Sequence, residues 1–501
     1  MLKMFGGGGP DHPMANPKEA KRILEALPAQ ELKALEELSH WHESVSSVPG
    51  FKPADRAALL ASIDDAAAPR VRKLARDYFA AKRPSRYQEN LMWTQLHEYW
   101  RQAGQAWARS LDAALQAGKG ADPKLLPLLA VRTLRSVGTQ LKWQHMRYGP
   151  IDNAVWGIVN KSYAVAEERG MADAKVAIGA SGESSAQLEF LRLVMFSASS
   201  PDGLLPLEVE LAERLIVDLS NGFVLSKLPA REHLFWTDLQ KPMAPQRAIK
   251  TMPGTPGLRG FGPGAAMATL QGHIQKTIQG RAVPSGINLG GSFDFEIVLE
   301  VMQHLALHWD LEPPERRHAR HPVKSRLTIK NGFQGALDSL GGTGSLDFDA
   351  KAGAESWIVE NVSAGGFGAV VPQAAKGDWL RVGVLLAMQP DGGANWVVGI
   401  VRRVNRVSKD EARVGIETVS RAPAVARFSL GALGEHTGLL LPAAVLGSGE
   451  VAIALPMSVY ARGTNVEANI DGKDHVYMPI GGADKGEDYE LLRFREMVRE
   501  V

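Results

Sequence analysis

The chain has 501 residues with 45% hydrophobic and 22% charged side chains, a formal net charge of +2 and no cysteine. This composition is typical of a globular protein of several domains; it excludes disulfides and thiolate chemistry and gives no reason to expect nucleic acid as a partner. No apolar run approaches the roughly 20 residues that cross a bilayer, and the first residues lack the apolar core of a signal peptide. We therefore expect a cytoplasmic protein without membrane insertion.

A helical pattern follows a flexible leader. The glycine-rich start before Pro10 predicts that residues 1–16 form no packed element. Apolar residues at spacings of three and four then predict an all-helical region over residues 17–310, with a break near residues 171–184 that would divide it into two subdomains. Its helices are expected at Pro53–Asp64, Pro69–Lys82, Tyr87–Ala117, Pro123–Tyr148, Asp152–Arg169, Ser185–Ala198, Leu207–Ser220 and Phe293–Trp309. Asp152 fits an N-cap and Gly170 a C-terminal glycine.

The segment Thr251–Gly264 is rich in glycine and proline and predicts a loop. It differs from a phosphate-binding glycine loop, because no Gly-Lys-Ser/Thr follows it and no strand precedes it.

Three features of the helical region could carry chemistry, and each has a simpler interpretation. His304 and His308 could share a metal with Asp310, but the apolar residues between them favour an ordinary amphipathic helix. The aromatic residues, among them Trp93, Trp100 and Trp107 at spacings of seven, indicate a packed helix face rather than a platform for nucleic-acid bases. The segment around Ser181 lacks the Gly-x-Ser-x-Gly elbow of a serine hydrolase. No nucleophile–base set or metal site stands out, so we expect no catalytic residue, no metal and no enzyme.

The pattern changes at Pro313-Pro314. Short β-branched runs between glycine turns then predict a small barrel over residues 311–421. Its strands are expected at Ser325–Ile329, Ser356–Asn361, Ala369–Val371, Leu380–Met388, Trp396–Val404 and Ala412–Thr418. Residues 422–501 predict a further β-rich module, for which a degenerate barrel is one interpretation, with strands at Gly438–Leu441, Glu450–Leu455, Asn465–Ile470 and Val476–Ile480 and a mixed tail at Tyr489–Val501. Asp471-Gly472 is a strong hairpin signal.

Two short motifs in the barrel region suit an anionic nucleotide. Arg316 and Arg320 are four residues apart, with Arg317 beside them, so one local segment can present several guanidinium groups to a phosphate or to the face of a base. Downstream, residues 361–366 read Asn-Val-Ser-Ala-Gly-Gly. Such a turn offers an amide, a hydroxyl and glycines that let the backbone approach a ligand.

With both motifs on one small β unit, the segment from about residue 313 to residue 421 resembles a PilZ domain, a bacterial receptor module for cyclic di-GMP. The family has an Arg-x-x-x-Arg motif before an Asp/Asn-x-Ser-x-x-Gly motif, and both are complete here. The resemblance implies that Arg316, Arg317 and Arg320 bind the phosphates and stack on guanine. It implies equally that Asn361 and Ser363 bind a guanine edge beside Gly365 and Gly366.

The resemblance has one departure. Many family members carry an aromatic residue on a later strand that stacks on a second guanine, whereas this chain has Arg403 at that position. A guanidinium can take the same place by stacking on the base.

These observations predict a multidomain α+β protein that binds cyclic di-GMP and acts as an effector. The ligand would be coupled to a rearrangement of the helical region or to its binding of a protein partner. No cofactor beyond this ligand is expected. The alternative is a protein-interaction scaffold whose PilZ-like barrel does not bind nucleotide.

Overall fold

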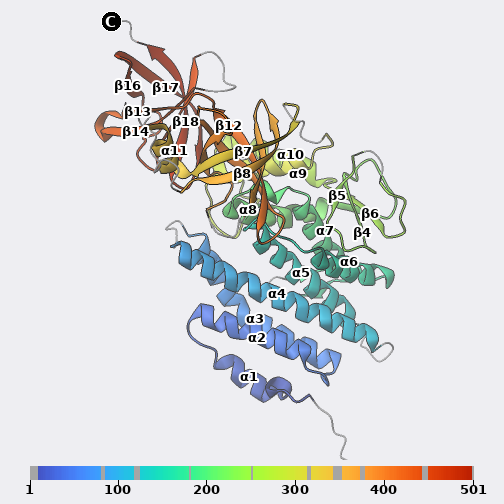
Figure 1. The fold of residues 1–501 in the computed structure, drawn as a ribbon. Helices are drawn as coiled ribbons and strands as arrows, with labels where there is room; N and C mark the ends of the chain where they lie inside the picture. The colour runs from blue at the N-terminus through green and yellow to red at the C-terminus, as the bar shows by residue number, and fades with distance from the viewer. Residues whose placement is uncertain are drawn as a thin grey trace, which may run out of the picture. The chain divides into compact units, whose positions relative to one another are not determined.

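The computed structural model describes residues 10–80, 85–117, 124–179, 182–249, 252–312, 318–341, 353–372, 379–442 and 449–498. They belong to two compact units. Unit 1 comprises Met1–Arg147, Ile151–Pro201 and Pro206–Pro314, and unit 2 comprises Tyr148–Pro150, Asp202–Leu205 and Glu315–Val501. Figure 1 colours the helices of unit 1 from blue to yellow-green and the strands of unit 2 from yellow to red. The predicted α+β architecture, with a helical region before small barrels, is confirmed.

Unit 1 is built mainly from helices. They are α1 (Pro17–Glu25), α2 (Glu31–Ser47), α3 (Pro53–Tyr78), α4 (Arg86–Gln116), α5 (Leu125–His145), α6 (Asn153–Glu168), α7 (Ala186–Ser197), α8 (Pro206–Leu219), α9 (Ala266–Gly280) and α10 (Phe295–His308). Within the described ranges, no helix is both long and apolar enough to cross a membrane.

Side-chain caps mark the start of several helices. Ser85 and Gln88 form a capping box at the start of α4, and the Asp152 side chain accepts the Ala154 N–H at the start of α6, as predicted. The prediction of two helices separated before Pro69 was wrong, because α3 runs through this proline. Proline removes one backbone donor, and packing of the buried face of α3 offsets that loss.

A buried carboxylate connects four of these helices. Asp64 of α3 accepts hydrogen bonds from Tyr99 Oη (2.9 Å) and Trp107 Nε1 (3.1 Å) of α4 and from Arg132 of α5 (3.2 Å). His42 Nε2 of α2 lies 3.0 Å from the same carboxylate. Burial alone would raise the pKa of Asp64, but His42, Arg132 and Tyr99 together hold it below its ordinary value.

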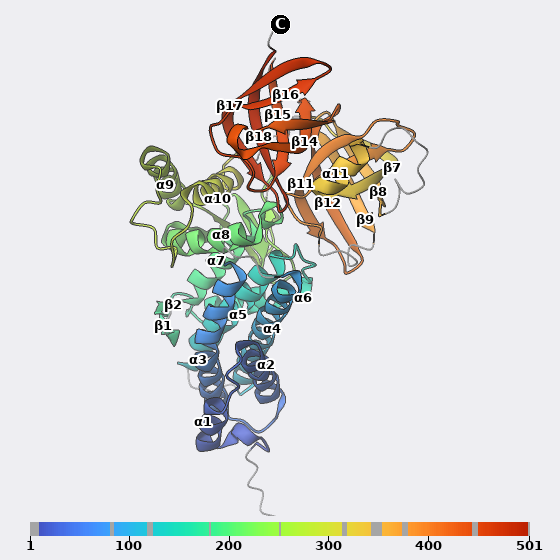
Figure 2. The same ribbon diagram turned by 90° about the vertical axis from the view of Figure 1, so that its left-hand side faces the viewer.

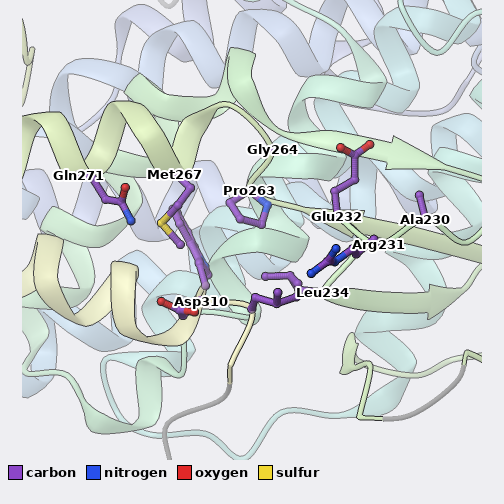
Figure 3. A pocket seen from close by; sticks show the side chains of 11 residues that line it. Ala230, Arg231, Glu232, Leu234, Pro263, Gly264, Met267, Gln271 and Asp310 are labelled. Carbon is purple, nitrogen blue, oxygen red and sulfur yellow. The ribbon is translucent and has the colours of Figure 1, made fainter.

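The prediction that residues 17–310 are all-helical was wrong in two places. A two-stranded hairpin joins β1 (Val176–Ala177) and β2 (Glu183–Ser184). A second, antiparallel sheet has the order β3-β6-β4-β5, formed by β3 (Val224–Ser226), β4 (Phe235–Asp238), β5 (Gln246–Arg247) and β6 (Leu258–Gly262). Strand β6 lies inside Thr251–Gly264, which was predicted to be a loop. A cavity lies between the loop that leads into β4, the start of α9 and the end of α10 (Figure 3).

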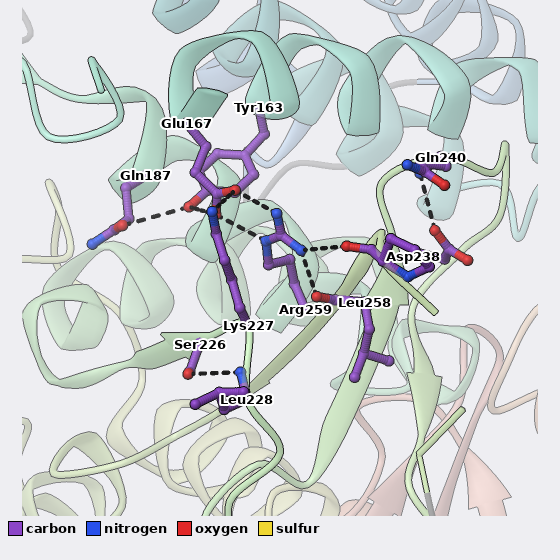
Figure 4. Close-up of polar contacts among 11 residues, drawn as sticks. Tyr163, Glu167, Gln187, Ser226, Lys227, Leu228, Asp238, Gln240, Leu258 and Arg259 are labelled. Carbon is purple, nitrogen blue, oxygen red and sulfur yellow. Dashed lines mark hydrogen bonds and ion pairs between the residues drawn. The ribbon is translucent and has the colours of Figure 1, made fainter. Parts of the chain in front are cut away.

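A polar cluster joins this sheet to α6 (Figure 4). Arg259 of β6 donates through two of its nitrogens to the two carboxylate oxygens of Glu167, and Lys227 lies 3.1 Å from the same carboxylate. Burial alone would raise the pKa of Glu167, and these two cations lower it instead. The cluster therefore provides partners for both the buried Arg259 guanidinium and the Glu167 carboxylate.

Unit 2 contains two closed barrels, drawn from yellow to orange and from orange-red to red in Figures 1 and 2. Barrel 1 is formed by β7 (His321–Asn331), β8 (Glu355–Ser363), β9 (Gly366–Pro372), β10 (Leu385–Pro390), β11 (Val397–Arg406) and β12 (Glu411–Ser420). Its closed order is β7-β8-β9-β12-β11-β10. All neighbouring strands are antiparallel, and the inward side chains include Trp357, Val359, Val401 and Val414.

Barrel 2 repeats this topology. It is formed by β13 (Ala424–Ser429), β14 (Glu435–Pro442), β15 (Glu450–Pro456), β16 (Val466–Ile470), β17 (Lys473–Lys485) and β18 (Tyr489–Val498), in the closed order β13-β14-β15-β18-β17-β16. Asp471 and Gly472, both at positive φ, turn β16 into β17 as predicted. The mixed tail predicted from Tyr489 was wrong, because β18 completes the barrel there.

The two barrels share an apolar core. Helix α11 (Gly332–Gly341) and the outer faces of β10 and β11 pack on the outer faces of β14, β15 and β18. Phe333, Leu385, Leu439 and Leu491 are among the buried side chains. Asp488, between β17 and β18, accepts the Phe333 N–H at 2.7 Å and so holds the start of α11.

Candidate functional site

The predicted Asn-x-Ser-x-x-Gly motif forms the hairpin between β8 and β9 of barrel 1. Strand β8 ends at Ser363, β9 begins at Gly366, and the two residues between them make the turn. Ser363 pairs with Gly366 and donates its hydroxyl to the Gly366 carbonyl at 3.3 Å. The motif is therefore held in a defined conformation at one end of the barrel.

Strand β12 and the residue that follows it hold this turn in place. The Thr418 N–H donates to the Gly365 carbonyl, and the Arg421 guanidinium donates to the Ala364 carbonyl, both at 2.9 Å. The Thr418 hydroxyl is buried without a hydrogen-bond partner among the described residues. We did not predict a role for Thr418 or Arg421; the pairing of β9 with β12, which are not consecutive in the chain, brings them here.

Strand register places the arginine motif beside the turn. His321 and Pro322 of β7 pair with Val362 and Asn361 of β8. Continuing this register one residue puts Arg320, whose side chain is exposed, opposite Ser363. Arg316 and Arg317 lie outside the described residues. The structure therefore brings one of the three predicted arginines next to Asn361 and Ser363.

Four outward positions form a row across four adjacent strands of barrel 1. Asn361 of β8 pairs with Gly368 of β9, Gly368 pairs with Gly415 of β12, and Gly415 pairs with Arg403 of β11. Neighbouring strands lie about 4.8 Å apart, so the row spans about 14 Å. We call Gly366, Gly368 and Gly415 the glycine floor, because these residues place no side chain between Asn361 and Arg403. Gly366 and Gly368 are buried, whereas Gly415 is half-buried.

Packing requires two of these glycines but not the third. A Cβ on Gly366 would overlap the Ile416 carbonyl oxygen, and one on Gly368 would lie 2.6 Å from Asn361 Nδ2. A Cβ on Gly415 would meet only the Arg403 Cβ, at an ordinary 3.5 Å, and its backbone is not left-handed. The fold would therefore accept a side chain at residue 415, and its absence leaves an open surface.

The Asn361 side chain lies over Gly368 with its amide oxygen buried and without a hydrogen-bond partner in the described part of the chain. A β-bulge beside it, between Val359 and Asn361, turns the residue to the outer face. Buried acceptors are seldom left unpaired, because desolvation without a partner is unfavourable. The Asn361 amide oxygen thus lacks a donor within the described residues.

Two arginines lie at the other end of the row. Arg403 Nε is 3.0 Å from Asp202 Oδ2, a residue of the same unit, and the Arg403 side chain is 54% exposed. Arg402 contacts Glu417 and Asp484, each at 2.7 Å. Burial alone would lower the pKa of Arg402, but the two carboxylates raise it. Arg402 is neutralised by these carboxylates, whereas Arg403 forms a half-exposed ion pair with Asp202 at the edge of the site.

The corresponding face of barrel 2 is covered. Because the two barrels have the same strand order, the face formed by β8, β9, β12 and β11 corresponds to that of β14, β15, β18 and β17. Leu439, Leu441, Ala454 and Leu491 of that second face are buried against barrel 1 and α11. In barrel 1 this packing is limited to the β11 end of the face, where Val398 and Ile400 are buried in the shared core, and Gly415 and Arg403 lie outside that core.

The other candidates have structural roles. His304 Nε2 lies 2.7 Å from the Ser199 carbonyl, and the described residues contain no group of three or more side chains suited to a metal. Trp107 is fully buried, and Trp93 donates to the Trp143 carbonyl, which agrees with packing on a helix face. Ser181 lies outside the described residues.

A comparison with family models adds an independent observation. Residues 18–230 match the model of the cyclic-di-GMP receptor FimW, N-terminal domain. The matched segment contains α1 to α8 and ends before barrel 1, so it does not include the two motifs. No curated protein matches the chain. The matched family is that of a cyclic-di-GMP receptor, and the matched residues lie outside both motifs.

Proposed function

We propose that the chain is a cyclic di-GMP receptor, that barrel 1 is a PilZ domain, and that the ligand lies on the glycine floor. The observation that carries the proposal is the row Asn361–Gly368–Gly415–Arg403, in which two glycines separate an amide oxygen without a partner among the described residues from a guanidinium. The family match over residues 18–230 supports the same ligand from another part of the chain.

The ligand's chemistry suits this row. Guanine carries N–H donors on its Watson–Crick edge, and the Asn361 amide oxygen is an acceptor in need of one. A flat base can approach bare backbone closely, which a side chain at residue 415 would prevent. In this proposal Arg403 stacks on a base or contacts a phosphate, while Arg320, with Arg316 and Arg317, binds phosphate oxygens.

Binding at the arginine motif would act on the connection between the units. Arg316 and Arg320 lie in the chain between α10 of unit 1 and β7 of barrel 1. We propose that a ligand bound to this connection favours one arrangement of the helical region or changes its binding of a protein partner. Small-angle scattering with and without cyclic di-GMP tests this step, and identical profiles at saturation would contradict it. We propose further that the protein acts in the cytoplasm.

Barrel 2 supports the alternative of a protein-interaction scaffold, because a barrel of the same topology here uses the equivalent face for packing. Calorimetric titration with cyclic di-GMP decides between the two. We expect saturable binding that Arg320→Ala weakens by about 10- to 150-fold, the effect of losing charge-assisted hydrogen bonds of about 1.5–3 kcal/mol. Arg427→Ala, at an exposed arginine of barrel 2, should bind like the wild type. Absence of heat at tens of micromolar ligand would favour the scaffold.

A further inference from the structure

A cavity of about 690 Å³ lies within unit 1, and none of the motif residues of barrel 1 lines it (Figure 3). Its walls are the segment 230–234 before β4, the connection from β6 into α9, the first turns of α9 and the segment that ends α10. This volume is within the range of small-molecule sites in proteins.

The wall between β6 and α9 is fixed by close backbone approaches. A Cβ on Gly262 would overlap the Glu232 carbonyl oxygen, and one on Gly264, at φ +48°, would lie 2.6 Å from the Gly222 carbonyl oxygen. Pro263, between these glycines, lines the cavity. Since both glycines are required for the chain to pass here, the wall is a built part of the fold.

Trp309 supplies a buried donor. Its side chain is fully buried and packs edge-on against Phe223, with ring centroids 5.5 Å apart. Within the described ranges, the indole N–H has no hydrogen-bond acceptor. A buried indole normally finds a partner, and leaving one unpaired costs about 1–3 kcal/mol. Because Trp309 lines the cavity, a ligand can supply the acceptor.

Arg231 supplies a positive charge. Its guanidinium forms no ion pair with any described residue. Figure 3 shows its side chain extending toward Leu234, whereas the Glu232 carboxylate points away. The start of α9, where Ala265 provides no side-chain cap, adds the positive end of a helix. Asp310 is the carboxylate on the opposite wall, and its side chain already accepts the Glu312 N–H at 3.1 Å.

We propose that this cavity binds a small amphipathic carboxylate. Its anionic head would contact Arg231, an oxygen would accept the Trp309 N–H, and its hydrocarbon or aromatic body would lie against Leu234, Pro263, Met267 and Leu311. Leu311 is 54% exposed, so the cavity has an apolar edge that a ligand would cover. This site does not depend on cyclic di-GMP binding, and the two proposals can fail separately.

The test is NMR of the full chain labelled with ¹⁵N-tryptophan, with 2-naphthoate as the probe and neutral 2-naphthamide as its matched control. The Trp309 indole signal is assigned by its loss in Trp309→Phe. We expect 2-naphthoate to move this signal downfield saturably, as a new acceptor would. Arg231→Gln should weaken 2-naphthoate about tenfold, the loss of one charge-assisted contact, and leave 2-naphthamide unchanged.

Two further variants locate the site. Met267→Glu and Leu311→Glu place a carboxylate in the cavity from different elements and should abolish the shift. Ile278→Glu, at an exposed position of α9 outside the cavity, should keep it. A Trp309 signal that does not move at millimolar 2-naphthoate would overturn the proposal. So would a shift that persists in Leu311→Glu, whose half-exposed position should not disturb folding.

Discussion

Replacing Gly415 with valine tests whether the glycine floor exists for a ligand. A Cβ at residue 415 meets only the Arg403 Cβ at 3.5 Å, so the barrel should accept the new side chain. Glycine inside a strand is destabilising by roughly 0.5–1 kcal/mol relative to residues that suit strands. Gly415→Val should therefore stabilise unit 2 by a similar amount, and raise its unfolding midpoint by about 1–4 °C.

The same change should impair binding, since a branched side chain would occupy the space of a base. Losing close contact over one base costs about 1–3 kcal/mol, by analogy with stacking, which corresponds to about 5- to 150-fold in affinity. Anisotropy of fluorescently labelled cyclic di-GMP measures affinity, and differential scanning calorimetry measures stability. Thr437→Val, an exposed position of β14, is the control for a valine in a strand. If Gly415→Val bound ligand like the wild type while folding normally, the floor would not be the binding surface.

Three other predictions concern the Arg403 ion pair, the buried face of barrel 2 and the Asp64 cluster. Asp202→Asn should strengthen cyclic di-GMP binding about 1.5- to 5-fold, because it removes the carboxylate of a partly exposed ion pair with Arg403 worth about 0.2–1 kcal/mol. An equal gain in Asp410→Asn, which removes an exposed carboxylate between β11 and β12, would show an effect of net charge alone. The face of barrel 2 that corresponds to the site is buried, so calorimetric titration with cyclic di-GMP should show one class of site. The double variant Arg320→Ala/Gly415→Val should give no residual heat of binding, and retention of half the heat would point to a second site on barrel 2. Asp64→Ala should destabilise unit 1 by about 3–5 kcal/mol in urea unfolding, because it removes the carboxylate that Arg132, which is 13% exposed, and the fully buried His42 share. Asp112→Ala, at a half-exposed pair, should cost at most about 1 kcal/mol. Because the folded-state pKa of Asp64 is lowered, its contribution should be complete above about pH 4 and fall away as the pH drops through the folded pKa, and a pH-independent difference from Asp64→Asn would contradict this.

The strands and the turn of the site were predictable because their signals are local. Alternation of apolar residues and glycine turns marked the six strands of barrel 1, and the Asn361–Gly366 motif reads directly as a hairpin. Helix ends with a side-chain cap, such as Asp152, were equally accessible. The errors arose where packing overrides a local signal, as at Pro69 inside α3.

The floor of the site was not predictable from one sequence. Gly366 and Gly368 are two apart, which is a period-two signal for one face of a strand. Gly415 joins them only through the pairing of β9 with β12, and that non-consecutive pairing is a property of the barrel's closure. Asp202 is still further from its partner Arg403 along the chain, so no spacing rule could have indicated their ion pair.

The crystal structure of the chain with cyclic di-GMP tests the central claim most directly. We predict a guanine lying over Gly368 and Gly415, with a base N–H donated to the Asn361 amide oxygen and phosphate oxygens at Arg320. A ligand bound elsewhere, with the outer face of β8, β9, β12 and β11 left bare, would contradict the account.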